Sequence, residues 1–124
     1  MELKKKVRLV QIIGAASDAL TKLEDNINMM RAKGKTPAKE DTQLLRSIER
    51  NLDLLKQNPF RGDNVQKEKW PKEFSNLPNL FRIELAGFWR LLYYVTGDEV
   101  KVVSVVFEIC DHSEYDRIFG YKKR

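Results

Sequence analysis

The last third of the chain holds four side chains with the capacity for chemistry, namely Arg82, Arg90, His112 and Tyr115. Arginine stays charged, and its planar guanidinium group binds phosphate oxygens through paired hydrogen bonds. Histidine exchanges protons near neutral pH because its ordinary pKa is ~6.5. These residue types suit the binding of a phosphate and the transfer of a proton, provided that the fold brings the side chains together.

Three β-rich runs must position these residues: Leu80–Leu85, Trp89–Val95 and Val100–Ile109. Short turns containing Gly87 and Gly97 separate the runs, which predicts an antiparallel meander. The titratable residues after the third run, among them His112 and Tyr115, would then cluster at one end of the sheet.

The first turn fixes which side chains share a sheet face. If it pairs residue 85 with residue 89, then Glu84 lies opposite Arg90, and Arg82, Glu84, Arg90 and Tyr94 share one face, with the bulky apolar residues on the other. A plain cross-strand ion pair between Glu84 and these arginines, worth ~0.2–1 kcal/mol, is the alternative to a functional role. The third run is apolar on both faces, so its register stays open.

The first half of the chain predicts a strand and two helices. The strand covers Leu3–Ile13, and a helix begins with Ser17 as its N-cap and ends near Gly34. A second helix opens at Thr36-Pro37 and ends at Asn58. We therefore expect an α+β fold, in which an N-terminal strand and a two-helix hairpin accompany an antiparallel sheet of about four strands. The segment Tyr115–Tyr121 forms a short helix or an edge strand, and Lys122–Arg124 is a basic tail.

Composition narrows the class of protein. A chain of 124 residues suits one domain over residues 1–124. The single Cys110 and the single His112 leave too few ligands for an ordinary zinc site, so we expect no metal and no cofactor. No run approaches the ~20 apolar residues of a membrane span, and no secretory signal is found, which predicts a cytoplasmic protein without a membrane partner. The net charge of +5 favours a polyanion or an acidic protein as partner.

The remaining aromatic and sulfur side chains have more ordinary explanations. Residues 60–79 read as a loop-like connection, in which Trp70 could be either a stacking platform or a packed side chain. Trp89 falls on the same strand face as Leu91 and Tyr93, so it is expected in the core. Cys110 is expected to be a buried, unreactive thiol.

The order of strand, two helices and three-stranded meander resembles the RelE/ParE toxin superfamily of type II toxin–antitoxin systems. Three segments carry the resemblance: NPFRG at residues 58–62, FWRLLYYV at residues 88–95, and HSEY at residues 112–115. The second segment is similar to the family's Gly-Tyr-Arg-Leu-x-Tyr strand, and the third to its His-x-x-Tyr ending. The resemblance covers most of the chain and implies a compact α+β toxin held inactive by an antitoxin segment that wraps it.

In the RelE branch, the resemblance further implies metal-independent cleavage of messenger RNA in the ribosomal decoding site. A ribose 2′-hydroxyl attacks the adjacent phosphate, which requires cations for the developing charge and groups that exchange protons. Carried over by position, Arg82 and Arg90 hold the scissile phosphate, His112 exchanges protons, and Tyr115 stacks on a base or assists proton transfer. Glu84 departs from the pattern, because ribosome-dependent members often have a basic residue there.

Two alternatives remain open at this point. A ParE-like protein would poison DNA gyrase without being a nuclease, and a non-catalytic module would keep the fold as half of a complex. His112 could simply cap a turn beside Asp111, and Tyr115 could anchor the end of the chain. For either toxin we expect an acidic amphipathic antitoxin segment docking on the face that carries Arg82, Arg90 and, if its register permits, Lys101. The ribosome and messenger RNA are further partners of a RelE-like protein.

Overall fold

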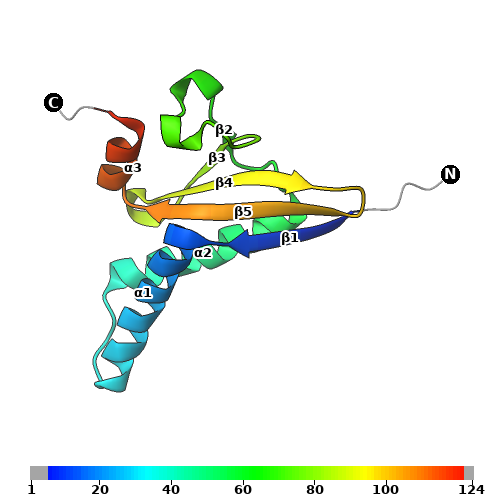
Figure 1. Ribbon diagram of the computed structural model, residues 1–124. Coiled ribbons are helices and arrows are strands. Elements are labelled where there is room, and N and C mark those ends of the chain that lie inside the picture. Colours follow the sequence, from blue (N-terminus) through cyan, green and yellow to red (C-terminus); the bar gives the residue numbers. More distant parts are fainter. Residues whose placement is uncertain (1–5, 122–124) are drawn as a thin grey trace.

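A computed structural model describes residues 6–121; the start of the predicted first strand and the basic tail at 122–124 lie outside these residues. The α+β prediction is confirmed (Figure 1). The elements in chain order are β1 (Val7–Ile12), α1 (Gly14–Ala32), α2 (Lys39–Gln57), β2 (Asp63–Asn64), β3 (Phe81–Glu84), β4 (Arg90–Gly97), β5 (Lys101–Cys110) and α3 (His112–Phe119), with 3₁₀ turns at Lys67–Lys69, Lys72–Phe74 and Ala86–Phe88.

The sheet is mixed rather than wholly antiparallel. It has five strands in the order β1-β5-β4-β3-β2, and β1 runs parallel to β5 while the other pairs are antiparallel. The chain leaves β1, passes through both helices and the meander, and returns along the same direction in β5 (Figure 1). Because this parallel pairing joins segments far apart in sequence, local strand patterns could not reveal it.

The register expected between β3 and β4 is confirmed. Glu84 pairs with Arg90 and Arg82 with Leu92, and the amide of Leu85 donates to the carbonyl of Trp89 at 2.8 Å. The register of β5, which the sequence left open, shifts opposite Leu92 and Tyr93, where residue 107 is passed over. The bulge reverses the alternation of faces in β5, so that Val103 and Val105 share the face of Arg90 on one side of it, and Glu108 and Cys110 share that face on the other side.

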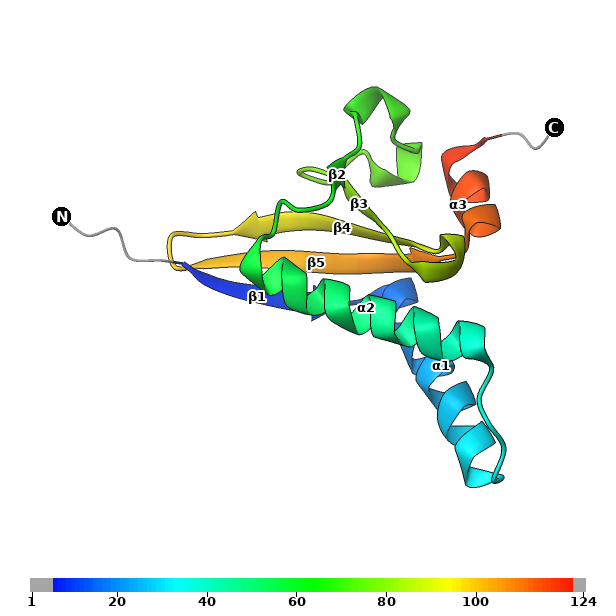
Figure 2. The same ribbon diagram turned by 180° about the vertical axis from the view of Figure 1, so that it is seen from behind.

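The helices α1 and α2 cover one face of the sheet, as predicted (Figures 1 and 2). Their buried side chains join those of the sheet in one core, which includes Leu23, Ile27, Leu44, Ile48, Leu55, Phe81, Ile83, Leu91, Tyr93 and Val106. The C-terminal part of α1 diverges from the sheet (Figure 2). Burial on α1 accordingly ends at Ile27, and Met29 is half exposed.

Both helices begin at residues other than those predicted. The first starts at Gly14, ahead of the expected cap Ser17, and the second starts at Lys39, after the expected Thr36-Pro37. Neither N-cap residue makes a side-chain hydrogen bond. The amide of Ser17 donates to the carbonyl of Ile13, so the backbone bond of the first turn replaces the side-chain cap.

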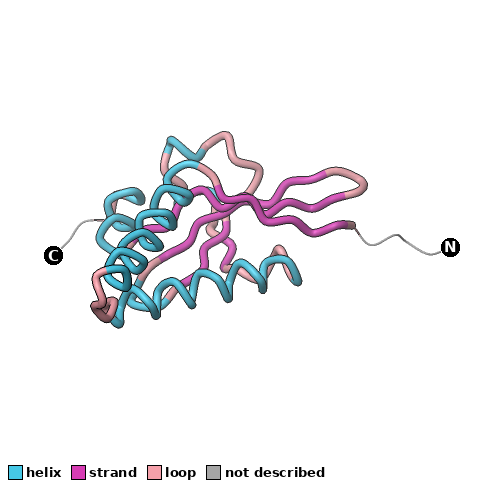
Figure 3. The backbone as a smooth tube through the Cα atoms, turned by 90° about the horizontal axis from the view of Figure 1, so that it is seen from below, coloured by secondary structure: helices cyan, strands magenta, loops and turns pink. Residues whose placement is uncertain are grey.

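A second, smaller core lies on the other face of the sheet. There α3 and the connection at residues 65–79 pack over β3, β4 and β5, above the sheet in Figure 1, whereas Figure 3 views the molecule from the side of α1 and α2. Its buried members are Val65, Leu80, Leu92, Cys110 and Tyr115. The connection expected to be unstructured is thus held by a two-residue strand and two 3₁₀ turns, and Trp70 donates from Nε1 to the carbonyl of Val65 at 2.8 Å.

The NPFRG segment anchors the end of α2 to the sheet. The hydroxyl of Tyr93 donates to the carbonyl of Pro59 at 2.8 Å and accepts from the amide of Gly62 at 3.0 Å. A Cβ atom at position 62 would lie 2.9 Å from the Tyr93 ring and hydroxyl. Glycine is therefore required by the close approach, and the segment has a structural role in directing the chain toward β2.

Across residues 6–121, none of the helices has the length and apolar character needed to cross a membrane.

Candidate functional site

Three of the four predicted site residues meet beneath α3. The guanidinium of Arg82 donates from Nη1 to the Tyr115 hydroxyl at 3.0 Å and lies 5.8 Å from the centre of the Tyr115 ring. Its Nη2 lies 3.7 Å from a carboxylate oxygen of Asp63. The hydrogen bond to Tyr115 is the largest cause of a raised Arg82 pKa, partly opposed by burial. Arg82 is therefore a charged group held by two side chains, Tyr115 and Asp63.

Arg90 approaches the same ring from the neighbouring strand. Its guanidinium carbon lies 5.6 Å from the centre of the Tyr115 ring. The Nη1 atom donates to the carbonyls of Phe88 and Trp89, and Nη2 lies 3.8 Å from Glu84. The ion pair with Glu84 that the sequence offered as an alternative for both arginines is thus present for Arg90, whereas Arg82 pairs with Asp63. Arg90 is held mainly by backbone carbonyls and one exposed carboxylate.

The two guanidinium groups also have unused donors. The Nε atoms of Arg82 and Arg90 are both buried, and neither has a hydrogen-bond partner among the described residues. A buried donor without a partner is costly, so such groups usually bind water or a ligand. The two side chains remain partly exposed elsewhere, 32% for Arg82 and 18% for Arg90, so an anion can reach the guanidinium groups through those parts and not through the buried Nε atoms.

Tyr115 is buried, with 4% of its surface exposed. Its ring stacks on Phe119 with the centroids 4.4 Å apart, and burial raises the pKa of its hydroxyl, while the hydrogen bond from Arg82 acts in the opposite direction. A buried ring has no free face for an RNA base. In this arrangement Tyr115 holds the two arginines, which places it in a positioning role.

Among the described residues, His112 does not take part in the contacts that join Arg82, Arg90 and Tyr115. It is the first residue of α3 and is exposed. Its ring meets the edge of Phe88 with the centroids 6.3 Å apart. Phe88 is itself 72% exposed and has a φ of 63°, which is rare for a residue with a side chain. Within residues 6–121 the His112 side chain makes no hydrogen bond, so both ring nitrogens are available to a ligand.

The local sequence explains how α3 is set. Asp111 caps the helix by accepting from the amide of Glu114 at 2.8 Å, and Gly120 ends it in the left-handed conformation with a φ of 73°. The alternative in which His112 caps a turn beside Asp111 is not realised, because Asp111 itself supplies the cap. His112 is left with its side chain at the positive end of the helix dipole, where negative charge is favoured.

Two contributors to the site were absent from the sequence prediction. Asp63 reaches Arg82 because the two-residue strand β2 pairs with β3, and no strand pattern marks such a short segment. Phe88 reaches His112 because the turn before β4 places it there.

Lys101 shares the sheet face of the arginines but lies at the far end of β4, opposite the end where Arg90 pairs with Cys110. It is therefore not part of this site.

The expected roles of two further residues agree with the fold. Trp89 packs against the main core, and Cys110 is buried, with the pKa of its thiol raised to about 12 chiefly by burial.

No family model matches this chain, and no curated protein matches it. In the described part of the chain, no three His, Cys, Asp or Glu side chains gather as metal ligands would.

Proposed function

We propose that this protein is the toxin of a type II toxin–antitoxin system and acts as a ribosome-dependent endoribonuclease on translated messenger RNA. The observation that carries the proposal is the convergence of Arg82 and Arg90 on the Tyr115 ring, with both side chains still partly exposed. The similarity of its sequence segments to the RelE branch supports the assignment to RNA.

The proposed reaction needs only groups that this chain supplies. The ribose 2′-oxygen attacks the adjacent phosphorus, the bond to the 5′-oxygen of the next nucleotide breaks, and a 2′,3′-cyclic phosphate and a free 5′-hydroxyl result. Negative charge develops on the phosphate oxygens, where Arg82 and Arg90 stabilise it. Neutral His112 accepts the proton of the 2′-hydroxyl, and its imidazolium form delivers a proton to the leaving 5′-oxygen.

Glu84 regulates the availability of Arg90 in this proposal. Its carboxylate lies 3.8 Å from Arg90 Nη2 and is largely exposed. A phosphate entering the site displaces the carboxylate, because the exposed ion pair is worth only ~0–1 kcal/mol. The cognate antitoxin is an acidic amphipathic segment that competes for the same arginines, and the protein works in the cytoplasm, where translation occurs.

Cleavage can be tested in a cell-free translation reaction. Primer extension on the message would compare wild type with Arg82→Ala, Arg90→Ala and His112→Ala, and Arg46→Ala, an exposed arginine on α2, is the matched control. We expect new 5′ ends within the translated message for wild type and the control, and their loss in the three site variants. Absence of cleavage by folded wild type would reject the nuclease.

The Arg90–Glu84 ion pair favours one other candidate, a ParE-like inhibitor of DNA gyrase. An arginine already paired with a carboxylate is less suited to catalysis and compatible with a surface that binds protein. A supercoiling assay with purified gyrase separates the two functions: inhibition without messenger RNA cleavage supports the gyrase inhibitor, and cleavage without inhibition supports the nuclease.

A further inference from the structure

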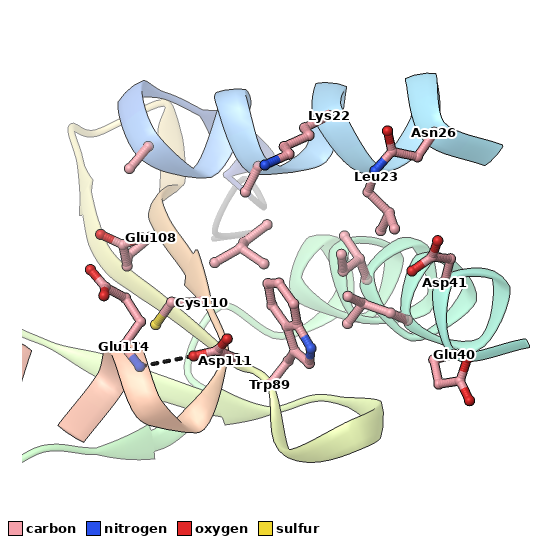
Figure 4. A pocket seen from close by; sticks show the side chains of 15 residues that line it. Lys22, Leu23, Asn26, Glu40, Asp41, Trp89, Glu108, Cys110, Asp111 and Glu114 are labelled. Carbon is pink, nitrogen blue, oxygen red and sulfur yellow. Dashed lines mark hydrogen bonds between the residues drawn. The ribbon is translucent and has the colours of Figure 1, made fainter. Parts of the chain in front are cut away.

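A cavity of about 420 Å³ lies at the end of the sheet, where β5 continues past the last paired residue of β1, and neither Arg82 nor Arg90 lines it. It opens between α1 and α2 and is closed by the end of β5 and the start of α3 (Figure 4). Its apolar lining consists of Trp89, Leu23, Leu44, Ile48 and Ile109. A volume in this range is typical of sites for small organic molecules, which occupy clefts of roughly 300–1,000 Å³.

The polar residues around this cavity are strongly biased in charge. Five carboxylates line it, against the single ammonium group of Lys22: Glu40, Asp41, Glu108, Asp111 and Glu114. Glu40 and Asp41 stand at one end and the other three at the opposite end (Figure 4). The whole chain carries +5, so the field at this cavity has the opposite sign to that of the molecule. An anionic ligand would be repelled here.

Not all five carboxylates are available to a ligand. Asp111 accepts from the amide of Glu114, and Glu114 forms an ion pair with Arg117. Glu40, Asp41 and Glu108 make no ion pair within residues 6–121. Of these three, Glu108 is the carboxylate whose charged form is disfavoured. Burial raises the pKa of Glu108, and the nearby charges of Glu114 and Glu73 raise it further, while Arg117 lowers it. A cation beside Glu108 would relieve this cost.

We propose that this cavity binds a small organic cation with an apolar body. The body lies against the indole of Trp89 and the aliphatic floor, and the cationic group lies beside Glu108. An ammonium that also approaches the indole face gains a cation–π attraction in addition to its charge pairing. The inference does not depend on the proposed nuclease, because neither the two arginines nor Tyr115 line the cavity.

Binding can be followed by fluorescence, because the chain has two tryptophans and Trp70→Phe leaves Trp89 as the only one. The probes are 2-phenylethylamine as the cation, 2-phenylethanol as the neutral analogue and 3-phenylpropanoate as the anion. In low salt we expect the amine to bind at least tenfold more tightly than the alcohol, and the anion not to bind. Equal affinities for the amine and the alcohol, or no binding of the amine, would overturn the proposal.

Variants then test which side chains supply the charge. The double variant Glu108→Gln/Asp41→Asn keeps the shape of the cavity and should weaken amine binding at least fivefold without changing alcohol binding. Glu49→Gln/Asp53→Asn, with the same charge change on the exposed side of α2, is the matched control and should bind as wild type does. An equal loss in both double variants would reduce the effect to net charge and overturn the site.

The last arm distinguishes a free amine from a side chain of a protein. The blocked tripeptide Leu-Lys-Leu carries the same ammonium on an apolar body. Binding of this peptide much more tightly than 2-phenylethylamine would reassign the cavity to a protein partner and overturn the small-molecule assignment. Similar or weaker binding of the peptide supports it. Circular dichroism of every variant confirms that the fold is intact before affinities are compared.

Discussion

Arg82 and Arg90 differ in how firmly each is held, although they share one tyrosine ring. Arg82 is fixed by the Tyr115 hydroxyl and by Asp63, while Arg90 is held by two backbone carbonyls and Glu84. This difference makes separate predictions for the residues that hold each arginine. Arg82 depends on a hydroxyl that can be removed without changing the ring, and Arg90 depends on a carboxylate that can be neutralised without changing its shape.

Removing the Tyr115 hydroxyl tests the positioning role. In Tyr115→Phe the ring still packs on Phe119, but Arg82 loses its hydrogen-bond acceptor. We expect messenger RNA cleavage to slow by about tenfold and the free energy of unfolding to fall by ~1 kcal/mol. Single-turnover kinetics and urea denaturation measure the two effects. A variant that loses stability but cleaves at the wild-type rate would show that Tyr115 is structural only.

Neutralising Glu84 tests its control over Arg90. In Glu84→Gln the ion pair is lost and Arg90 is free for phosphate, so we predict cleavage faster than wild type by a few fold. Stability should change little, because the pair is exposed. The cleavage rate at saturating ribosome concentration is the measurement. Slower cleavage would mean instead that the Glu84 carboxylate takes part in the reaction.

At the scale of elements, the turn between β4 and β5 sets the register of both strands. A Cβ atom at Gly97 would lie 2.3 Å from the carbonyl oxygen of Lys101, which is backbone and cannot move aside. Gly97→Ala should therefore destabilise the fold by ~1–3 kcal/mol. Thermal unfolding compares it with Thr96→Ala, a neighbouring exposed position. If both variants unfold at the same temperature, the turn is more adaptable than its geometry indicates.

The elements that local patterns define were predictable, and those defined by distant contacts were not. Alternation of apolar and polar residues gave the β3–β4 pairing, and with it the shared face of Arg82, Glu84 and Arg90. The parallel pairing of β1, the two-residue β2 and the bulge in β5 depend on contacts between segments far apart in the chain. The helix starts were misplaced because backbone bonds, not the side chains of Ser17 or Thr36, begin the helices.

The candidate site shows the same division. Its two arginines were predicted to share a face, but the burial of Tyr115 follows from α3 folding back over the sheet, which no local pattern reports. The exposure of His112 follows from Asp111 taking the capping position. At this scale, the helix α3 decides which of the predicted side chains are buried and which can meet a ligand.

At the scale of the whole molecule, two places of opposite charge lie near one end of the sheet. The two arginines meet the Tyr115 ring of α3, and the carboxylate-lined cavity lies between the end of β5 and the two long helices (Figure 4). One domain can thus attract a polyanion and a small cation at different places.

Stability of the whole molecule should fall in alkali through Cys110. Burial raises the pKa of its thiol from 9.0 to about 12, so between these values the unfolded chain has lost the proton while the folded chain keeps it. Raising the pH therefore favours unfolding in this window, by up to ~1.4 kcal/mol per pH unit for one group. The raised pKa values of Tyr93 and Tyr115 act in the same direction.

Urea unfolding at pH 8 and pH 11 measures this loss. We expect Cys110→Ala to be less stable than wild type at pH 8, because a buried side chain is shortened, but to lose less stability between the two pH values. The alkaline loss that remains in the variant reports the other groups. Identical losses in wild type and variant would mean that the thiol ionises equally easily in the folded state.

The most direct test of the central claim is the chemistry of the cut message on loaded ribosomes. Purified protein would be mixed with ribosomes carrying a defined message, and the fragments would be analysed for their rate of appearance and their ends. We predict a 2′,3′-cyclic phosphate and a 5′-hydroxyl, with rates reduced at least a hundredfold in Arg82→Ala and Arg90→Ala and unchanged in Arg46→Ala. Uncut message, or cleavage that survives loss of both arginines, would contradict the account.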